Sequence, residues 1–312
     1  PIGVSWAKPL GYMYQFDMSS FTVVTTSEDL QDPVGEELAS KYEETQVRFE
    51  FVGPLLDKTG AARATAHKYK TAEEACAAVA AEHPDAYPSV QEVVAKVTEA
   101  RAAGRRVVLV SMGTVVTGDN PHLGWNGRMP GPDGEPRGLS GKQLCRGTWG
   151  GAFDAFGSQV AEEGPLLVIA LGPQPEPLAG LPVPPNAICM PSVPQVDLLR
   201  AGIDLFLTHG GQNSFTESMS CGTPVVVCPG FGDQIVNSRK AVSLSVGLKV
   251  DRPDPDVGDE AEAATAYRAA CCQAMREVDA DASFTAGARR IAENLRQAGG
   301  VRRAKELMLE AA

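Results

Sequence analysis

From residue 105 onward, the sequence predicts an α/β domain with a Rossmann-like, mainly parallel sheet. Short apolar runs alternate with helical segments, which favours βαβ units. Each run is apolar on both faces, as expected for strands that helices cover on both sides. The predicted strands are Arg106–Ser111, Leu166–Leu171, Ala187–Met190, Leu205–Thr208, Pro224–Cys228 and Leu248–Val250. The helices predicted between most of them are 140–162, 195–201, 213–221 and 234–246.

Two further segments precede this domain. In residues 1–57, strands are predicted at Phe21–Thr26 and Val47–Val52, with a short polar helix at 34–44 between them. Residues 58–104 are rich in Ala, Glu and Lys and read as a helical insertion. Its predicted helices are Ala72–Ala81 and Ser89–Ala103, the second opened by a Ser89/Glu92 capping box. The predicted division of the chain is therefore 1–57, 58–104 and 105–312.

Three stretches of the last segment differ from the strand–helix pattern. Residues 117–139 are rich in glycine and proline and poor in aliphatic residues, which predicts a long surface loop. Residues 252–264 are acidic and contain proline, so we expect them to be solvated. Two amphipathic helices at about 283–297 and 300–310, on either side of Gly299–Gly300, are predicted to close the chain.

Composition limits the partners and the location of the protein. The net charge of −11 disfavours binding to nucleic acid or to an anionic membrane surface. The seven cysteines include no CxxC pair and form no zinc pattern with the four histidines, so no metal site is predicted. The apolar runs are too short to span a bilayer and no signal peptide is visible. A cytoplasmic location is expected.

Two strand ends carry residues suited to an anionic ligand, because ligands of parallel α/β sheets bind at the carboxyl ends of strands. The first is Ser111-Met112-Gly113-Thr114, where Ser111, Gly113 and Thr114 offer hydroxyls and an accessible backbone. The signal is weak by itself, since many strands end in a plain tight turn of this composition. An anionic ligand and a simple turn are both open here.

The second strand end is His209-Gly210-Gly211-Gln212-Asn213-Ser214, followed by a predicted helix. Free amides and the dipole at a helix N-terminus can hold a diphosphate without a lysine. His209 can add one ring N–H to such a site. Taken singly, each feature has an ordinary explanation: a structural histidine, a glycine turn, or a capping box formed by Ser214 and Glu217.

Taken together, the motifs resemble the donor signature of the UDP-glycosyltransferases. The similarity runs through Val193-Pro194-Gln195, Leu205–Ser214, Glu217, Gly222-Thr223-Pro224, Pro229, Asp233-Gln234 and Asn237. It extends upstream to Ser111–Thr114 and, more loosely, to Phe21–Asp57. The resemblance implies the two-domain GT-B fold. Residues 105–312 would be the C-terminal nucleotide-sugar-binding domain, and residues 1–57 a remnant of the N-terminal acceptor domain and its linker.

The resemblance also implies roles for individual residues. His209, Gly211, Asn213 and Ser214 would hold the diphosphate, together with the Ser111–Thr114 turn. Glu217 would accept hydrogen bonds from the ribose hydroxyls, and Asp233 and Gln234 would hold the transferred sugar. Gln195 and the backbone near Val193 would lie beside the base and ribose. The UDP-sugar is a substrate, and neither a cofactor nor a metal ion is implied.

Two positions depart from the family. Ser192 stands where a tryptophan commonly stacks on uracil, which leaves the base open, and Gln212 stands where plant members carry tryptophan, which leaves the sugar open. The family's general base, a histidine near the start of the N-terminal domain, has no counterpart. His67, His83 and His122 match no base motif. We therefore expect the base outside this sequence, in a missing domain or a partner chain that supplies the acceptor half.

The leading hypothesis is an inverting, metal-independent transfer of a hexose from a UDP-sugar to a small-molecule or lipid hydroxyl. The nearest DxD string, Asp279-Ala280-Asp281, lies in a C-terminal helical region rather than at the predicted site. The alternative is a non-catalytic nucleotide-sugar-binding or scaffold protein, favoured by the absent acceptor half. A sugar-nucleotide epimerase of the same fold fits the donor signature less well.

Overall fold

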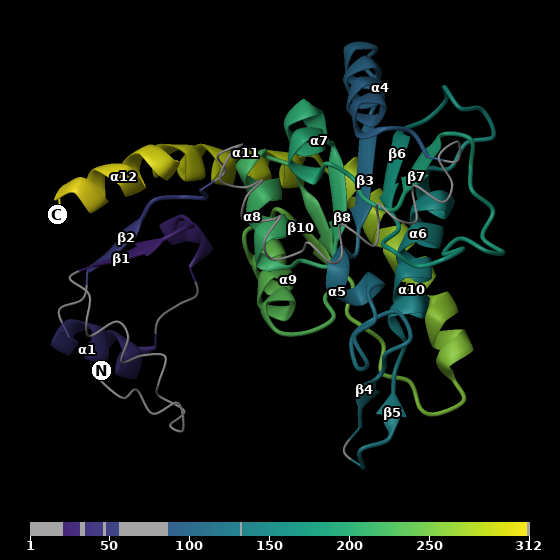
Figure 1. The fold of residues 1–312 in the computed structure, drawn as a ribbon, viewed down its shortest axis with the longest axis horizontal. Helices are drawn as coiled ribbons and strands as arrows, with labels where there is room; N and C mark the ends of the chain where they lie inside the picture. The colour runs from purple at the N-terminus through teal and green to yellow at the C-terminus, as the bar shows by residue number, and fades with distance from the viewer. Residues whose placement is uncertain (1–20, 32–34, 46–47, 56–86, 132, 311–312) are drawn as a thin grey trace. The chain divides into compact units, whose positions relative to one another are not determined.

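Six parallel strands form the central sheet. The computed structural model describes residues 21–31, 35–45, 48–55, 87–131 and 133–310 and gives the spatial order β10-β9-β8-β3-β6-β7 (Figure 1). The strands are β3 (Val107–Ser111), β6 (Leu166–Ala170), β7 (Ala187–Met190), β8 (Leu205–Thr208), β9 (Val225–Val227) and β10 (Gly247–Lys249). When the six strands are numbered in chain order, their spatial order is 6-5-4-1-2-3, which is the doubly wound Rossmann arrangement. The predicted fold class is confirmed, and each strand lies within a residue or two of its predicted position.

Helices cover both faces of this sheet (Figure 1). One face carries α4 (Val90–Ala102), α7 (Gln195–Gly202), α8 (Gln212–Ser220) and α9 (Asp233–Ser243). The other carries α6 (Gly141–Phe156) and α10 (Glu260–Ala280). The central strands β3, β6, β8 and β9 are almost entirely buried, with Val110, Ile169 and Leu207 all at 0% exposure, whereas the edge strands β7 and β10 are partly exposed. Burial on both faces explains why the central strands read as continuous apolar runs.

Helix α4 begins as the sequence predicts. The Ser89 side chain accepts from the Glu92 N–H, and the Glu92 side chain accepts from the Ser89 N–H, which confirms the capping box. The helix then packs against α7 and β3 as part of the helical layer. The other helix predicted in this segment, Ala72–Ala81, lies outside the described residues, as do His67 and His83.

The structure corrects the prediction of a surface loop at 117–139. The segment contains a two-stranded antiparallel ribbon, β4 (Met129–Pro130) and β5 (Pro136–Arg137), which follows the short helix α5 (Gly113–Thr117). Trp125 and Leu139 are buried in the main core, and the Trp125 ring lies 5.9 Å from that of Trp149. Two widely spaced apolar residues anchor the segment, so its average composition hides the order.

Helices α6 and α10 also differ from expectation. Helix α6 was predicted to reach residue 162 but ends at Phe156, where the Asn186 amide donates to the Phe156 carbonyl at 2.9 Å and accepts from the Ser158 N–H at 2.8 Å. Helix α10 begins at Glu260, inside the stretch expected to be solvated, and no bounds were predicted for it. Its close packing on α6 depends on small residues, since a Cβ at Gly151 would lie 2.9 Å from that of Cys271.

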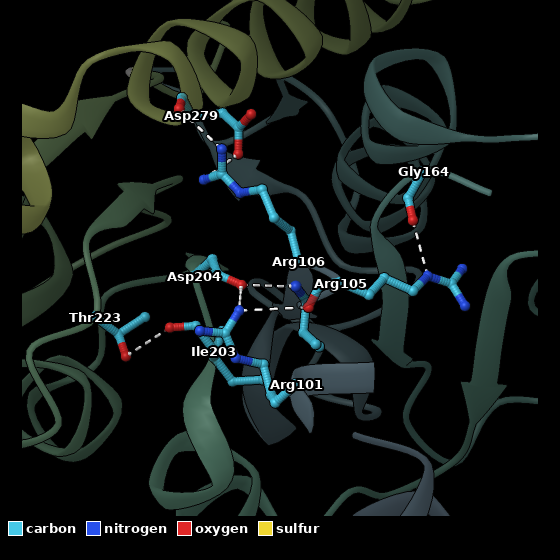
Figure 2. A network of polar contacts seen from close by, with 9 residues as sticks. Arg101, Arg105, Arg106, Gly164, Ile203, Asp204, Thr223 and Asp279 are labelled. Atoms are coloured by element: carbon cyan, nitrogen blue, oxygen red, sulfur yellow. Dashed lines mark hydrogen bonds and ion pairs between the residues drawn. The ribbon is translucent and has the colours of Figure 1, made fainter. Parts of the chain in front are cut away.

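The amino-terminal edge of the sheet is closed by a polar network, which Figure 2 shows around Asp204. The Asp204 carboxylate accepts the Val107 backbone N–H at 2.8 Å and pairs with Arg101. Arg106 pairs with Asp279 at 2.6 Å. The Asp204 carboxylate thus satisfies the first backbone N–H of β3. These contacts lie at the opposite end of β3 and β8 from Ser111 and Thr208, so their role is structural.

The described residues between 87 and 290 form one compact unit, and those of the segments 21–55 and 291–310 form a second. The second unit contains the parallel pair β1 (Phe21–Val24) and β2 (Arg48–Phe51), the short 3-10 helix η2 (Glu28–Leu30) and α1 (Glu36–Thr45). The last helices are α11 (Ala282–Gln297), within which the division falls, and α12 (Gly300–Glu310). Ala304 and Leu307 of α12 bury against Val52, so the C-terminal helix belongs with the first segment of the chain.

Among the described residues, every helix is either too short or too polar to cross a membrane.

Candidate functional site

The candidate site lies where the strand order of the sheet reverses. Strand β3 has β6 on one side and β8 on the other, and Ser111 and Thr208 are register partners at the carboxyl ends of β3 and β8. In doubly wound sheets the chain leaves these two strands in opposite directions, which opens a crevice for a ligand. Both strand ends that the sequence singled out therefore meet at this point.

His209 follows β8 directly, and its ring is held between two glycines. A Cβ at Gly113 would lie 2.4 Å from the ring carbon Cε1, and one at Gly211 would lie 2.6 Å from Nε2. Any other residue at either position would displace the imidazole. The predicted placement of His209, within reach of Ser111 and the start of the next helix, is confirmed.

The environment of His209 keeps its ring uncharged at neutral pH. Burial lowers the pKa of His209 to about 4, while the Asp233 carboxylate and the Ser111 backbone carbonyl partly oppose the shift. Nδ1 is buried and has no well-formed hydrogen bond to any described residue, although that carbonyl is near the ring. A neutral imidazole can donate one hydrogen bond to an anion but adds no full positive charge.

The N-terminus of α8 supplies further donors. Its N-cap is Gly211, which has no side chain to accept the free amides. The Gln212 N–H is taken by Asp233 at 2.8 Å, whereas the N–H groups of Gly211, Asn213 and Ser214 have no acceptor among the described residues. Unpaired amides at a nine-residue helix, with its dipole, favour a bound anion.

Beside these amides lies a polar cluster between α7 and α8. The Gln195 amide donates to Glu217 Oε2 at 2.7 Å and to Ser214 Oγ at 3.1 Å. Burial raises the pKa of Glu217, and the hydrogen bond from Gln195 lowers it in part. A half-buried carboxylate of this kind is suited to accept hydrogen bonds from a vicinal diol. The structure thus brings together Gln195, Ser214 and Glu217, and their contact with a ligand stays a prediction.

The remaining predicted residues have contacts of their own. Asp233 is exposed at the start of α9 and caps α8, whereas Gln234 is 3% exposed and its Oε1 accepts the Gly230 N–H at 2.8 Å. Contact between this pair and a sugar therefore stays a prediction. Thr114 is exposed on the first turn of α5, and the Val193 carbonyl accepts the Gln195 N–H at 2.8 Å.

Sequence reasoning gave no role to Asn237, although it belongs to the matched signature. The residue is 1% exposed and bonds the turn before α8. A polar residue one helical turn after Asp233, on the buried side of α9, was the available signal. No cluster of three or more His, Cys, Asp or Glu side chains suited to a metal occurs in the part of the chain that the structure describes.

Comparison with known proteins supports the resemblance. The family model for UDP-glucoronosyl and UDP-glucosyl transferase matches residues 172–253. The chain is 31% identical over 129 residues to the uncharacterized UDP-glucosyltransferase YojK of Bacillus subtilis, covering 41% of this chain and 29% of YojK. It is 28% identical over 138 residues to the NDP-glycosyltransferase YjiC of B. subtilis, covering 44% of this chain and 32% of YjiC. The matches thus span about a third of each relative.

Solved structures show the same fold. The glycosyltransferase of kitacinnamycin superposes with a TM-score of 0.55 at 22% identity, covering 97% of this chain and 63% of that one. Os79 from O. sativa, in complex with U2F and trichothecene, superposes with a TM-score of 0.55 at 18% identity, covering 97% and 56%. The fold is that of the GT-B glycosyltransferases. The chain is a relative of the family 1 UDP-glycosyltransferases, as the donor signature predicts.

Proposed function

We propose that this chain binds the donor of a glycosyl transfer, a UDP-sugar, in the crevice at the ends of β3 and β8. The observation that carries the proposal is the arrangement around His209. One neutral imidazole and three backbone N–H groups without acceptors among the described residues converge beside the Gln195–Glu217 pair. A diphosphate on the amides would place its ribose toward Glu217.

The proposed reaction is an inverting, metal-independent transfer of a hexose. An acceptor hydroxyl, of a small molecule or a lipid, attacks the anomeric carbon as the bond from that carbon to the diphosphate oxygen breaks. Charge then develops on the leaving nucleoside diphosphate. The amides of α8 and the His209 N–H are directed at that charge and need no rearrangement to stabilise it. The proton of the acceptor passes to a base that lies outside the described residues.

The site would hold its anion without a lysine or arginine, which fits the net charge of −11. The hydrogen bonds described above for Gln195, Glu217 and Asp233 join side-chain amide, hydroxyl, carboxylate and backbone N–H groups. Attraction to backbone dipoles is short-ranged and is screened little by salt. Affinity for UDP should therefore change less than about threefold when the salt concentration is raised tenfold.

Calorimetric titration with UDP and UDP-glucose tests the proposal. Removing a hydrogen bond to a charged group costs about 1.5–3 kcal/mol, so His209→Ala should weaken UDP binding by about 10- to 100-fold. Glu217→Ala should weaken it similarly, and Glu99→Ala, an exposed carboxylate near the end of α4, should leave it unchanged. No heat and no thermal shift at saturating UDP or UDP-glucose would reject the donor site.

A second titration tests which nucleobase the site prefers. Ser192 is exposed and stands where the family commonly has a stacking tryptophan. Comparing UDP with ADP at the same site, and Ser192→Trp with the parent chain, measures what the missing ring contributes. Stacking of a base on an aromatic side chain is worth about 1–3 kcal/mol, so Ser192→Trp should tighten UDP binding.

A further inference from the structure

Two polar side chains of helix α9 contact the residues at the start of α8 and in the turn before it. Asp233 accepts the Gln212 N–H, as described above. Four residues later, the Asn237 amide donates to the Gly210 carbonyl at 2.8 Å and to the Gln212 side-chain oxygen at 3.3 Å. Asn237 is almost fully buried, so it cannot itself lie against a ligand in the crevice.

The contact from Asn237 completes the immobilisation of Gly210. The Gly210 N–H donates to Thr208 Oγ1 at 3.2 Å, and its φ of +80° is open to glycine but strained for other residues. A Cβ there would also lie 2.4 Å from Val227 Cγ1. With its N–H, φ angle and carbonyl all fixed, Gly210 has one orientation.

The orientation of this residue determines where the next amide points. The peptide unit between Gly210 and Gly211 is planar and trans, so its N–H points opposite to its carbonyl. Because Asn237 draws the carbonyl toward α9, the Gly211 N–H is directed away from α9. That N–H is one of the three donors without an acceptor among the described residues.

We propose that Asn237 is a positioning residue of the donor site: it fixes the Gly210–Gly211 peptide so that the Gly211 N–H faces the diphosphate. The inference rests on the proposed function and adds to it a residue that does not touch the ligand. When the N–H group is already fixed before binding, no conformational entropy is lost in orienting it as the anion binds. Without Asn237, the Gly210–Gly211 peptide can rotate, and the Gly211 N–H no longer points at the diphosphate.

The test compares two substitutions with a control from the same helix. Asn237→Ala removes the amide, and Asn237→Asp keeps its size but places an acceptor against the Gly210 carbonyl. Ser238→Ala is the control, because Ser238 is equally buried and its hydroxyl donates to Ile235 within α9. UDP affinity by calorimetry should fall about tenfold in both Asn237 variants, the loss expected for one hydrogen bond to a charged group. The control should stay within twofold.

A spectroscopic readout separates positioning from general loosening. In the parent protein, UDP should move the backbone amide resonances of Gly211, Asn213 and Ser214. In both Asn237 variants the shift of Gly211 should disappear while those of Asn213 and Ser214 remain. Loss of all three shifts, or of none, would contradict the assignment.

The outcomes distinguish the two proposals. If the parent chain does not bind UDP, the proposed function fails and this inference fails with it. If the parent binds UDP and the Asn237 variants bind equally well, only the role of Asn237 is overturned. Should both variants fail to fold, the parent still decides: a Gly211 amide that UDP does not move, in a protein that binds UDP, refutes the positioning role.

Discussion

His209 should make the stability of this protein depend on pH in a way that a single substitution removes. In the folded protein its pKa is about 4, against an ordinary value of about 6.5. Between about pH 4 and 6.5, His209 is mostly protonated in the unfolded chain and mostly neutral in the folded protein. The stability contributed by the neutral ring is therefore complete above about pH 6.5 and is lost as the pH falls toward 4.

The expected magnitude follows from the size of the shift. A difference of about 2.5 pKa units corresponds to roughly 3 kcal/mol at about 1.4 kcal/mol per unit, and about 2.5 kcal/mol of this is lost between about pH 7.5 and pH 4.5. Urea unfolding at about pH 7.5 and pH 4.5 measures it, as the difference between the parent and His209→Gln. Carboxylates with raised pKa values, such as Glu217 and Asp279, titrate in both proteins and largely cancel.

A control histidine and a direct pKa measurement test this prediction. His122→Gln is the matched control, because it removes an exposed histidine that lies outside the site. If the difference between the parent and His209→Gln is the same at both pH values, the ring is not buried as described. A pKa near 6.5, measured for His209 by NMR, would lead to the same conclusion.

Three other substitutions have expected outcomes. Asp204→Ala leaves the Val107 N–H without its acceptor and should lower the free energy of unfolding by about 2 kcal/mol, with Asp204→Asn costing less. Gly113→Ala should weaken UDP binding more than tenfold by calorimetry, because its Cβ collides with the imidazole, whereas Gly104→Ala has the same φ of +72° but open space and should not. Trp125→Ala should destabilise the fold by about 3–5 kcal/mol in urea, and a loss below 1 kcal/mol would restore the surface-loop interpretation.

The sheet could be predicted from the sequence because its central strands are buried on both faces. The run Leu205–Leu207 has no polar position, and its short length and apolar composition mark it as a strand. Helix α10 was harder, because its buried residues Tyr267, Cys271 and Met275 are separated by alanines and charges that resemble a solvated stretch. The segment around Trp125 was mispredicted for a related reason: two buried side chains decide its order, and the average composition does not report them.

The residues of the donor site could be predicted from the sequence, but the contacts between them could not. A histidine, two glycines and a glutamate at fixed spacing identify Gly210–Glu217 as the start of a helix with free amides. The sequence did not indicate that the imidazole lies between Gly113 and Gly211, nearly a hundred residues apart, nor that Asn237 holds the Gly210 carbonyl. These contacts join segments whose proximity depends on the order of the strands.

The sequence by itself determined the local chemistry of this protein: which runs become strands, where α8 begins, and which residues can face an anion. Periodicity, caps and glycines act over a few residues, so they are legible in the chain. The tertiary structure alone decided that β3 and β8 are neighbours. That adjacency brings Ser111 beside His209, buries the ring and lowers its pKa. Burial and cross-strand contact depend on long-range packing, which no local pattern encodes.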